Sequence, residues 1–441
     1  MDTATYNRIT EWLRIHIERT RWEGHVFTVG GCCRDLILGA EIKDVDLAVD
    51  TPNGGIEFAR WLQSKGYLAG RPVVFEKFGT ARVILKEFPG EEIELVQTRK
   101  EKYTRENSRC PEVCSGTIEE DCFRRDFTVN TLYHDISRGE DLDMTGHGVE
   151  DIKAGVLRTP LDPDSTFDDD PVRILRCLRF ASRFGWKIAP AVYAALRRNI
   201  PRLSIVSKER FHTELSKMLT GNNPYEAVRS LDEVGALGYA NPLLAEFIEQ
   251  SRPEGKIPGV WQYQIGNLRN LTYIPKDRRT LPVALALLLC DLGKMRSRVK
   301  DRRGEVRFPR HELTGANQVR KMLRSMKFDP EVADDVYFLI YNHHATGSWG
   351  PDADEMTDKG LRELQQTCGT PERFEMLIDF LLCRDPDNEG RYRRVAERSA
   401  ELCVLGTDSF PIPGEKVKAR GNRHNARRSS RRQFRRRSSG K

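Results

Sequence analysis

The alternation of apolar and polar residues over the first hundred positions predicts a sheet flanked by helices. Between residues 5 and 20 the apolar side chains recur at helical spacing, which predicts an amphipathic helix that packs on the sheet. A second helical run begins at Ile56 and is stopped at Gly66. Short apolar or alternating runs predict strands at residues 25–29, 44–49, 73–75, 80–85 and 92–97.

The strand predicted over residues 44–49 carries two acids. At a strand's period of two residues, Asp44 and Asp46 share one face about 6–7 Å apart, while three apolar side chains point into a core. Two like charges at this separation repel each other unless a cation lies between them. Magnesium is the natural cation, because it is a hard ion that takes carboxylate oxygen and tends to bring phosphate with it.

The residues before this strand predict a phosphate-binding turn. Gly30 and Gly31 let backbone N–H groups approach an anion, and the first turn of the helix predicted over residues 32–38, which is ended by Gly39, is electropositive. Arg34 in that turn adds a full positive charge. Each feature alone is more often structural, but together a phosphate cradle and a carboxylate pair indicate nucleotidyl transfer.

A third acid, Glu94, lies in the last of these strands, on the face opposite its two apolar neighbours. If this strand lies beside Asp46, Glu94 joins the metal site; if it does not, Glu94 is an ordinary exposed glutamate. The residues from Arg99 to Gly116 are polar, basic and without periodicity, which predicts a loop near phosphate.

Arginines gather in two places further along the chain. Arg124 and Arg125 stand beside Asp126 before an apolar segment, where burial requires ion pairs or a ligand. A helix is predicted from Asp168, an N-cap residue, to Phe184, with an apolar stripe opposite a stripe of arginines. Like charges at i, i+3 spacing repel, so this stripe is predicted to face triphosphate or RNA. Its members are Arg173, Arg176, Arg179 and Arg183.

Asp170 and Arg173 lie three residues apart at the start of this helix and project to the same side. A carboxylate accepts a hydrogen bond from an exocyclic amine, and a guanidinium donates to a bare ring nitrogen. Cytosine and adenine both present an amine beside such a nitrogen, whereas uracil and guanine present a carbonyl beside a ring N–H. The pair therefore suits C and A, and it rejects U and G through unpaired polar groups.

The chain has 441 residues, enough for roughly two to four domains with a sizeable core. Its net charge of +7 is concentrated in one segment. Residues 416–441 hold 12 of the 72 lysines and arginines and no acid, so the remaining 60 bases face 65 acids. The composition of this tail predicts disorder, and its charge predicts either a solvated tail or a salt-sensitive tether for RNA phosphate.

Several classes of protein are disfavoured. No run is long and apolar enough to span a membrane, and the basic-then-apolar order of a signal peptide is absent, which predicts a cytoplasmic protein without membrane association. The ten cysteines are scattered without a CxxC pair, and they predict reduced thiols rather than zinc ligands or disulfides. No P-loop and no GxGxxG occurs, so the common nucleotide-binding folds are not indicated.

Four motifs over residues 25–185 resemble the class II tRNA nucleotidyltransferase and bacterial poly(A) polymerase family, within the DNA polymerase beta superfamily. Two departures are modest: Asp169 stands where the family usually has Glu, and Thr131 where it usually has Ala. The matching stretches are Gly30-Gly31-Cys32-Cys33-Arg34-Asp35 with Leu38-Gly39, Lys43-Asp44-Val45-Asp46-Leu47, Arg124-Arg125-Asp126-Phe127-Thr128-Val129-Asn130, and Asp169-Asp170-Pro171-Val172-Arg173 through Arg176 and Arg179-Phe180-Ala181.

This resemblance implies an α+β protein, with a polymerase-beta-like head that has a mixed or antiparallel sheet, followed by an all-α body. It implies that Asp44 and Asp46 bind the catalytic magnesium ions, with Glu94 as a further acid of the catalytic site. Gly31 and Arg34 are implied to lie on the incoming nucleotide. Contacts to the bound ATP or CTP are implied for Arg125, Asp170, Arg173, Arg176 and Arg179, the Asp170–Arg173 pair standing in for a nucleic-acid template.

We expect four parts along the chain. A head over residues 1–150 is followed by a helical neck over 151–255, which recognises the base and binds RNA. A helical body covers 256–410. The resemblance implies that neck, body and tail together handle the tRNA acceptor end. A disordered basic tail covers 411–441.

Part of the body, residues 281–344, resembles an HD phosphohydrolase domain of the kind fused to some relatives. Cys290 stands where that domain has a His, and no His lies between His212 and His311 to supply the upstream ligand. We therefore predict a helical scaffold that has lost metal chemistry. The residues that carry this resemblance are Cys290, Asp291, His311, His343 and His344.

The predicted function is template-independent, Mg²⁺-dependent transfer of CMP and AMP from CTP and ATP to the 3′ end of tRNA, known as CCA addition. Two magnesium ions would bridge the primer 3′-hydroxyl and the α-phosphate of the nucleotide. Poly(A) polymerase is the close alternative, because the motifs are shared. An HD-type metal phosphohydrolase and a non-catalytic RNA-binding protein are alternatives from other classes.

Overall fold

The computed structural model describes residues 1–102, 112–344 and 357–404. The chain divides into two compact units, one over residues 1–341 and one over residues 342–441. The predicted boundaries between head, neck and body stay predictions, and the basic tail lies outside the described residues. None of the described helices is both long enough and apolar enough to cross a membrane.

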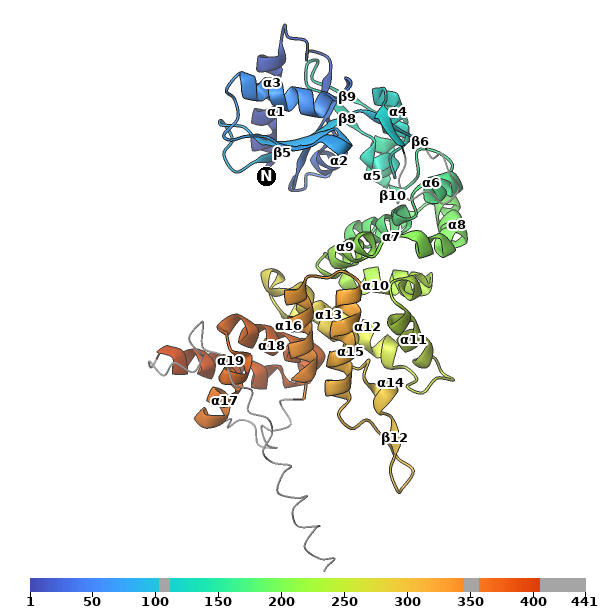
Figure 1. Cartoon of the computed structure of the whole chain (residues 1–441), viewed down its shortest axis with the longest axis vertical. Helices are drawn as coiled ribbons and strands as arrows, with labels where there is room; N and C mark the ends of the chain where they lie inside the picture. Colours follow the sequence, from blue (N-terminus) through green and yellow to red (C-terminus); the bar gives the residue numbers. More distant parts are fainter. Residues whose placement is uncertain (103–111, 345–356, 405–441) are drawn as a thin grey trace, which may run out of the picture. The chain divides into compact units, whose positions relative to one another are not determined.

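The first unit begins with a mixed sheet of seven strands (Figure 1). The neighbours β2 and β5 run parallel, and every other neighbouring pair of this sheet runs antiparallel. The strands predicted from alternation are all present, with bounds that differ by no more than one residue at either end. In spatial order the strands are β3 (Val73–Phe75), β4 (Thr80–Ile84), β5 (Glu92–Gln97), β2 (Val45–Val49), β1 (Val26–Val29), β8 (Tyr133–Asp135) and β9 (Glu140–Leu142).

Three helices cover the face of the sheet toward which the apolar side chains of β2 point. α3 (Gly54–Ser64) packs against β2, β4 and β5, and α2 (Gly31–Ile37) contacts β1 and β2. α1 (Thr3–Ile17) is joined to β1 by a buried hydrogen bond of 2.6 Å between the hydroxyl groups of Tyr6 and Thr28. The apolar side chains that the sequence predicts to point inward from β2 are fully buried, as the period of two requires.

The opposite face of the sheet carries Asp46 and a small apolar cluster. α4 (Ile118–Phe123) begins with a capping box between Thr117 and Glu120, and it contributes to this cluster. The cluster consists of Phe27, Val29, Ala48, Cys122 and Tyr133, with Val96, Ile118, Leu142 and Met144 packed against it. Apolar packing thus occupies one end of this face and leaves the acids toward the other end.

The segment after β5 is more regular than its sequence predicts. β6 (Arg99–Lys102) pairs antiparallel with β7 (Glu112–Ser115), and the residues between them lie outside the described residues. The prediction of an irregular loop is therefore wrong for these two strands. The pattern failed because β6 consists only of charged residues, so no apolar alternation marks it.

The single helix predicted from Asp168 to Phe184 is two helices. α6 (Pro163–Asp169) ends before α7 (Val172–Phe184) begins. A proline disfavours helical backbone in the residue before it, and Asp170, which precedes Pro171, is extended with φ −141° and ψ 95°. Asp168 therefore lies near the end of one helix, and Asp170 lies at the junction of the two.

The described remainder of the chain is helical apart from two pairs of two-residue strands, which confirms the predicted α+β class. These strands are β10 (Val156–Leu157) with β11 (Lys187–Ile188), and β12 (Val299–Lys300) with β13 (Val306–Arg307). The helices of the first unit are α5 (Gly148–Ala154), α8 (Pro190–Asn199), α9 (Lys208–Leu219), α10 (Pro224–Glu233), α11 (Pro242–Gln250), α12 (Val260–Asn267), α13 (Leu281–Leu289), α14 (Lys294–Ser297), α15 (His311–Ser325) and α16 (Pro330–Tyr341). Those of the second unit are α17 (Asp358–Cys368), α18 (Pro371–Arg384) and α19 (Glu389–Val404).

Candidate active site

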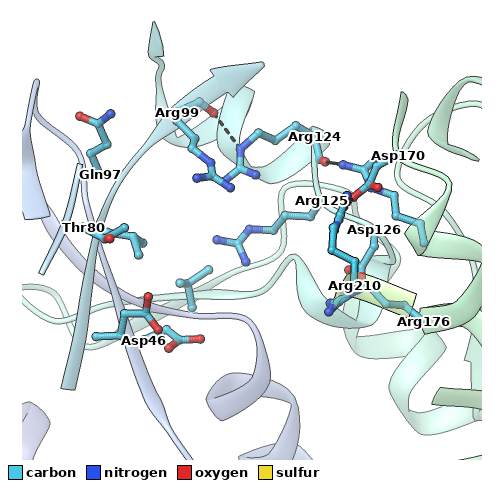
Figure 2. Close-up of a pocket in the computed structure, with 14 residues that line it drawn as sticks. Asp46, Thr80, Gln97, Arg99, Arg124, Arg125, Asp126, Asp170, Arg176 and Arg210 are labelled. Atoms are coloured by element: carbon cyan, nitrogen blue, oxygen red, sulfur yellow. Dashed lines mark hydrogen bonds and ion pairs between the residues drawn. The ribbon is translucent and has the colours of Figure 1, made fainter. Parts of the chain in front are cut away.

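One cleft in the first unit collects charged side chains from the sheet, from the residues after α4 and from α7 and α9. Its volume is about 390 Å³, and its lining includes six arginines and four acids. Figure 2 shows Asp46 on one side, Asp170 and Arg210 on the other, and the guanidinium of Arg125 between them. The lining residues are Val29, Asp46, Thr80, Glu94, Val96, Gln97, Arg99, Arg124, Arg125, Asp126, Asp170, Arg173, Arg176 and Arg210.

Asp46 and Glu94 are paired in register across the parallel strands β2 and β5. Both side chains point to the same face, at the spacing of neighbouring strands, about 4.8 Å. Burial, followed by the charge of Glu94, raises the pKa of Asp46 to about 6. Asp44 is exposed one residue before β2, outside the cleft lining, and its charge adds to this repulsion. The strand of Glu94 lies beside the strand of Asp46, as the third-acid prediction requires. Together these acids form a group that a cation would stabilise.

The glycine turn before α2 lies close to an arginine of the cleft. Gly30 has a φ of +78°, and a Cβ atom there would lie 3.2 Å from Nη1 of Arg125, so both the backbone and the space favour glycine. Arg34 is buried and bonded to Asp35 at 2.8 Å, and neither it nor Gly31 lines the cleft. The nucleotide contacts implied for Gly31 and Arg34 therefore stay predictions.

Arg124 and Arg125 enter the cleft just after α4, and one buried carboxylate holds both. Asp121 accepts hydrogen bonds from each guanidinium group. Burial alone would raise the pKa of Asp121, but the charges of Arg125 and Arg124 hold it well below its usual range. The two arginines thus form structural ion pairs, one of the two roles that the sequence left open, and because they also line the cleft, the role in holding a ligand stays a prediction.

Asp126 is bonded to an arginine of α7. Its carboxylate accepts a hydrogen bond of 2.7 Å from Nε of Arg176 and another of 3.0 Å from the side-chain amide of Asn130. Burial acts to raise the pKa of Asp126, but the charge of Arg176 and these hydrogen bonds together lower it to about 2. This ion pair ties the segment after α4 to α7 across the edge of the cleft.

Asp170 and Arg173 both line the cleft, and each is bonded to a different group. Asp170 accepts a hydrogen bond of 2.7 Å from Arg210 on α9. Arg173 is buried and donates to the backbone carbonyl groups of Thr166 and Arg124. The structure therefore brings the predicted pair into one cleft, where each member has hydrogen-bond partners within the protein, and recognition of a base by the pair stays a prediction.

The rest of the arginine stripe on α7 is turned away from the cleft. Arg179 forms a buried ion pair of 2.6 Å with Glu214 on α9, and Arg183 lies 4.0 Å from Asp35. Contacts of Arg179 and Arg183 with triphosphate or RNA therefore stay predictions. Acids from distant parts of the chain, which the local sequence does not reveal, relieve the repulsion among the arginines.

The region that resembles an HD domain contains a cluster of buried polar side chains. They come from α12 and from the residues directly after α13. Asp291 accepts a hydrogen bond of 2.7 Å from the side-chain amide of Gln264, whose oxygen lies 3.2 Å from the sulfur of Cys290. A ring nitrogen of His311 lies 3.6 Å from Asp291. The predicted loss of metal chemistry stays a prediction. The remaining residues of the resemblance, in the second unit, are His343 and His344.

Sequence reasoning missed two residues of this site. Arg210 lies in the first turn of α9, 40 residues from Asp170, and nothing in its local sequence distinguishes it from a solvated arginine. Asp121 lies on α4, which opens with a capping box at Thr117, and its burial follows only from the packing of α4 on the sheet.

Two family models match the chain. The model described as the poly A polymerase head domain matches residues 26–158. The model described as a probable RNA and SrmB-binding site of polymerase A matches residues 185–248. The first match contains the seven-stranded sheet and α4, and the second contains α9, so both include residues that line the cleft.

Curated relatives match a little less than half of the chain. The mitochondrial CCA tRNA nucleotidyltransferase of Saccharomyces cerevisiae is 40% identical over 215 residues, which are 45% of this chain and 39% of the relative. Poly(A) polymerase I of Escherichia coli O157:H7 is 34% identical over 208 residues, which are 46% of this chain and 44% of the relative. The chain thus spans about two fifths of the length of these relatives.

The chain is also similar to the solved structure of the Bacillus stearothermophilus CCA-adding enzyme in complex with CTP. The TM-score is 0.61 at 22% sequence identity, and the similarity covers 92% of this chain and 84% of that chain. At this identity the similarity shows the fold, which is a head with a mixed sheet followed by a helical body.

Proposed function

We propose that this member of the class II CCA-adding enzyme and poly(A) polymerase family transfers CMP and AMP from CTP and ATP to the 3′ end of tRNA without a nucleic-acid template. The yeast relative is named as a CCA tRNA nucleotidyltransferase, and the Bacillus structure contains CTP. Because the curated relatives match over less than half of their own length, the activity, the nucleotides and the tRNA partner are proposals for this chain.

One observation carries the proposal: a single cleft is lined both by Asp46 with its strand neighbour Glu94 and by Asp170 with Arg173, and Figure 2 shows Asp46 and Asp170 on opposite sides of it. A nucleotide that spans such a cleft has its phosphates near the acids and its base near the pair. The acids alone would indicate only cation binding. It is their presence in one cleft with the Asp170–Arg173 pair that supports the proposal of nucleotidyl transfer.

We propose that Mg²⁺ binds at the acidic group, held by Asp44 and Asp46, with Glu94 beside them. The donors fit this ion, because carboxylate oxygen is its preferred protein ligand. The raised pKa of Asp46 reflects burial and the repulsion from Glu94, both of which a cation would offset. When bound, Mg²⁺ would lower the pKa of the primer 3′-hydroxyl and neutralise charge on the departing pyrophosphate.

The protein's own groups bind and select the nucleotide. Arg125 and Arg176 present guanidinium groups to the cleft, and such groups bind phosphate oxygen in pairs of hydrogen bonds. Asp170 accepts from the exocyclic amine of C or A, and Arg173 donates to the neighbouring ring nitrogen. A base that binds Asp170 replaces Arg210 as the hydrogen-bond donor to this carboxylate.

The test is incorporation of labelled CTP into tRNA that lacks its CCA end, with ATP and Mg²⁺ present. We expect CMP and AMP to be added by the full chain. Replacing both Asp44 and Asp46 by alanine should lower the rate about 100-fold or more, because electrostatic stabilisation of the developing charge is lost.

A matched control is the double variant Glu140→Ala/Asp141→Ala, which removes two exposed acids from β9 at the edge of the same sheet. It should leave the rate within about two-fold, since single exposed acids away from a site contribute little. Full activity of the Asp44/Asp46 double variant would contradict the proposed site, and absence of CMP addition by the unmodified chain would contradict the proposed function.

A second candidate is poly(A) polymerase, which the similarity to the Escherichia coli enzyme supports. It predicts repeated AMP addition to RNA of any 3′ sequence and no CMP addition. Incubation of the same protein with ATP alone and with CTP alone, on tRNA and on an unrelated RNA, separates the two activities.

We also propose a cytoplasmic location, from the sequence pattern alone. The yeast relative is named as mitochondrial, so mitochondria are the competing compartment. Fractionation of cells that express the full chain with a small internal tag decides between them.

A further inference from the structure

Asp121 is a fully buried carboxylate on α4 that receives hydrogen bonds from separate parts of the chain. Its Oδ1 atom accepts from Arg124 and, at 3.2 Å, from the backbone N–H of Arg99 at the start of β6. Its Oδ2 atom accepts from Arg125 at 2.9 Å and from the hydroxyl of Tyr133 on β8. Both oxygens are thus engaged, and this one side chain ties the segment after α4 to β6 and to β8.

These contacts leave one end of Arg125 directed into the cleft. Nε and Nη2 of Arg125 face Asp121, and the guanidinium also lies 5.3 Å from the centre of the Tyr133 ring. Nη1 lies on the side of Gly30, where an added Cβ atom would be 3.2 Å away. Figure 2 shows the Arg125 guanidinium pointing toward the space above Asp46.

The orientation of Arg125 is therefore constrained from three sides. A guanidinium with two donors on one carboxylate and an aromatic ring beside it has little freedom to rotate, and a planar fork that is already oriented loses less entropy when it binds phosphate. The charges of Arg125 and Arg124 keep the pKa of Asp121 low in spite of burial, so the carboxylate stays ionised at neutral pH.

We propose that Asp121 is a positioning residue for the transfer reaction, which orients Arg125 and Arg124 toward the triphosphate of the incoming nucleotide. This proposal rests on the proposed function. Guanidinium forks match phosphate, whereas the groups suited to a base lie at the junction of α6 and α7. Asp121 therefore acts on CTP and ATP alike, and it has no part in the choice between bases.

The first experiment measures binding of Mg²⁺-tripolyphosphate, which has the phosphates of a nucleotide and no base, to the full chain by calorimetry. The variant is Asp121→Asn, which keeps the shape of the side chain and removes its charge. We expect binding to weaken about 10-fold to 100-fold, because charge-assisted hydrogen bonds that orient the arginines are lost. Unchanged binding by a folded variant would overturn the proposal, as would a failure of the unmodified chain to bind tripolyphosphate.

The matched control is Asp135→Asn, a change at an equally buried aspartate on β8. Asp135 accepts hydrogen bonds from the backbone N–H groups of Ser137 and Arg138, and it does not line the cleft. Loss of its charge should affect folding stability, and tripolyphosphate should bind within about two-fold of the unmodified chain. An equal loss of binding in both variants would reduce Asp121 to a merely structural residue and overturn the proposal.

A milder variant, Tyr133→Phe, keeps the experiment decisive if Asp121→Asn does not fold. It removes one hydroxyl that donates to Asp121 and accepts from Arg125. We expect a smaller loss of tripolyphosphate binding, about 3-fold to 10-fold, because one hydrogen bond of the network is removed. Tight binding as in the unmodified chain would contradict the proposed network.

A double-mutant cycle separates positioning from general stability. If Asp121 acts through Arg125 and Arg124, adding Asp121→Asn to the variant Arg124→Met/Arg125→Met weakens tripolyphosphate binding no further, whereas independent effects would multiply. In the transfer assay, KM for CTP and for ATP should rise by the same factor in Asp121→Asn, and the preference for C and A over U and G should stay unchanged. The binding readout needs no RNA, so failure of the proposed function and failure of this inference are distinguishable.

Discussion

Charged side chains at the cleft are held in fixed partnerships. Asp126 is bonded to Arg176, and Asp170 is bonded to Arg210. A buried charge without a partner is costly, so each partnership keeps a charged group at the cleft in one place before a ligand arrives. Groups that are already oriented in this way stabilise developing charge without reorganising during the reaction.

The ion pair between Asp126 and Arg176 predicts a measurable dependence of stability on pH. The pKa of Asp126 is lowered to about 2 from an ordinary value of 3.8. Because the folded state has the lower pKa, this contribution is fully present above pH 4 and is lost as the pH falls through 2. The shift corresponds to about 2 kcal/mol, of which roughly half is lost by pH 3.

The measurement is the free energy of unfolding by urea at pH 6 and at pH 3, for the unmodified chain and for Asp126→Asn. We expect the variant to be less stable at pH 6 and the difference to narrow by about 1 kcal/mol at pH 3. A difference that stays constant between the two pH values would show that the carboxylate charge does not stabilise the fold.

The acids of the site were predictable from the sequence, whereas the buried arginines were not. Asp46 and Glu94 belong to strands whose alternation gives their direction, and only their pairing across β2 and β5 required the structure. Arg34 and Arg179 belong to the motifs that carry the resemblance, and both are held in buried ion pairs. The partner of Arg179, Glu214, lies 35 residues away on another helix, and no local pattern reveals such a contact.

At the scale of elements, α7 and α9 are joined by the buried ion pair of Arg179 and Glu214. Glu214→Ala would leave the guanidinium buried without its carboxylate. We expect a loss of about 3–5 kcal/mol in the free energy of unfolding, the usual cost of breaking a buried pair by removing one partner. Chemical denaturation of the full chain measures it.

The control for this prediction is Glu233→Ala, on α10, which removes an acid from an exposed ion pair with Arg229. Its cost should stay below about 1 kcal/mol, because exposed pairs are screened by water and salt. Equal costs for the two variants would mean that the α7–α9 contact depends on apolar packing rather than on charge.

The elements differ in how far their sequences reveal them. The strands of the head were predictable because one face of each meets the core, so that apolar residues alternate with polar ones. The sequence does not reveal the break between α6 and α7, because Asp168 as an N-cap residue and Pro171 in a first turn also fit the start of one helix. A proline fits the first turn of a helix as well as the gap before it, and only the extended backbone of Asp170 distinguishes the two.

At the scale of the whole molecule, the segment over residues 416–441 holds 12 basic residues and no acid. We propose that it binds RNA phosphate without regard to sequence. Removal of residues 411–441 should then weaken tRNA binding at low salt and make the dependence of log Kd on log salt concentration shallower, by about 0.7 for each phosphate that is no longer neutralised. Fluorescence titration with labelled tRNA at several salt concentrations measures this slope.

A matched variant keeps the length of this segment and replaces its 12 lysines and arginines by glutamine. Both variants should show the same shallower slope, while the rate at saturating tRNA stays unchanged, because the cleft is intact. A slope that is equal for all three proteins would leave the segment without a part in RNA binding.

The order of the cleft along the chain has a consequence for how the protein is made. The lining runs from Val29 to Arg210, and β5, the later of the two strands that carry Asp46 and Glu94, ends at residue 97. During synthesis, domains fold as they leave the ribosome, from the N-terminus onward. The nascent chain therefore contains Asp46 and Glu94 well before α9 is synthesised, and it contains the last residue of the cleft lining, Arg210, only when about half of its length has been translated.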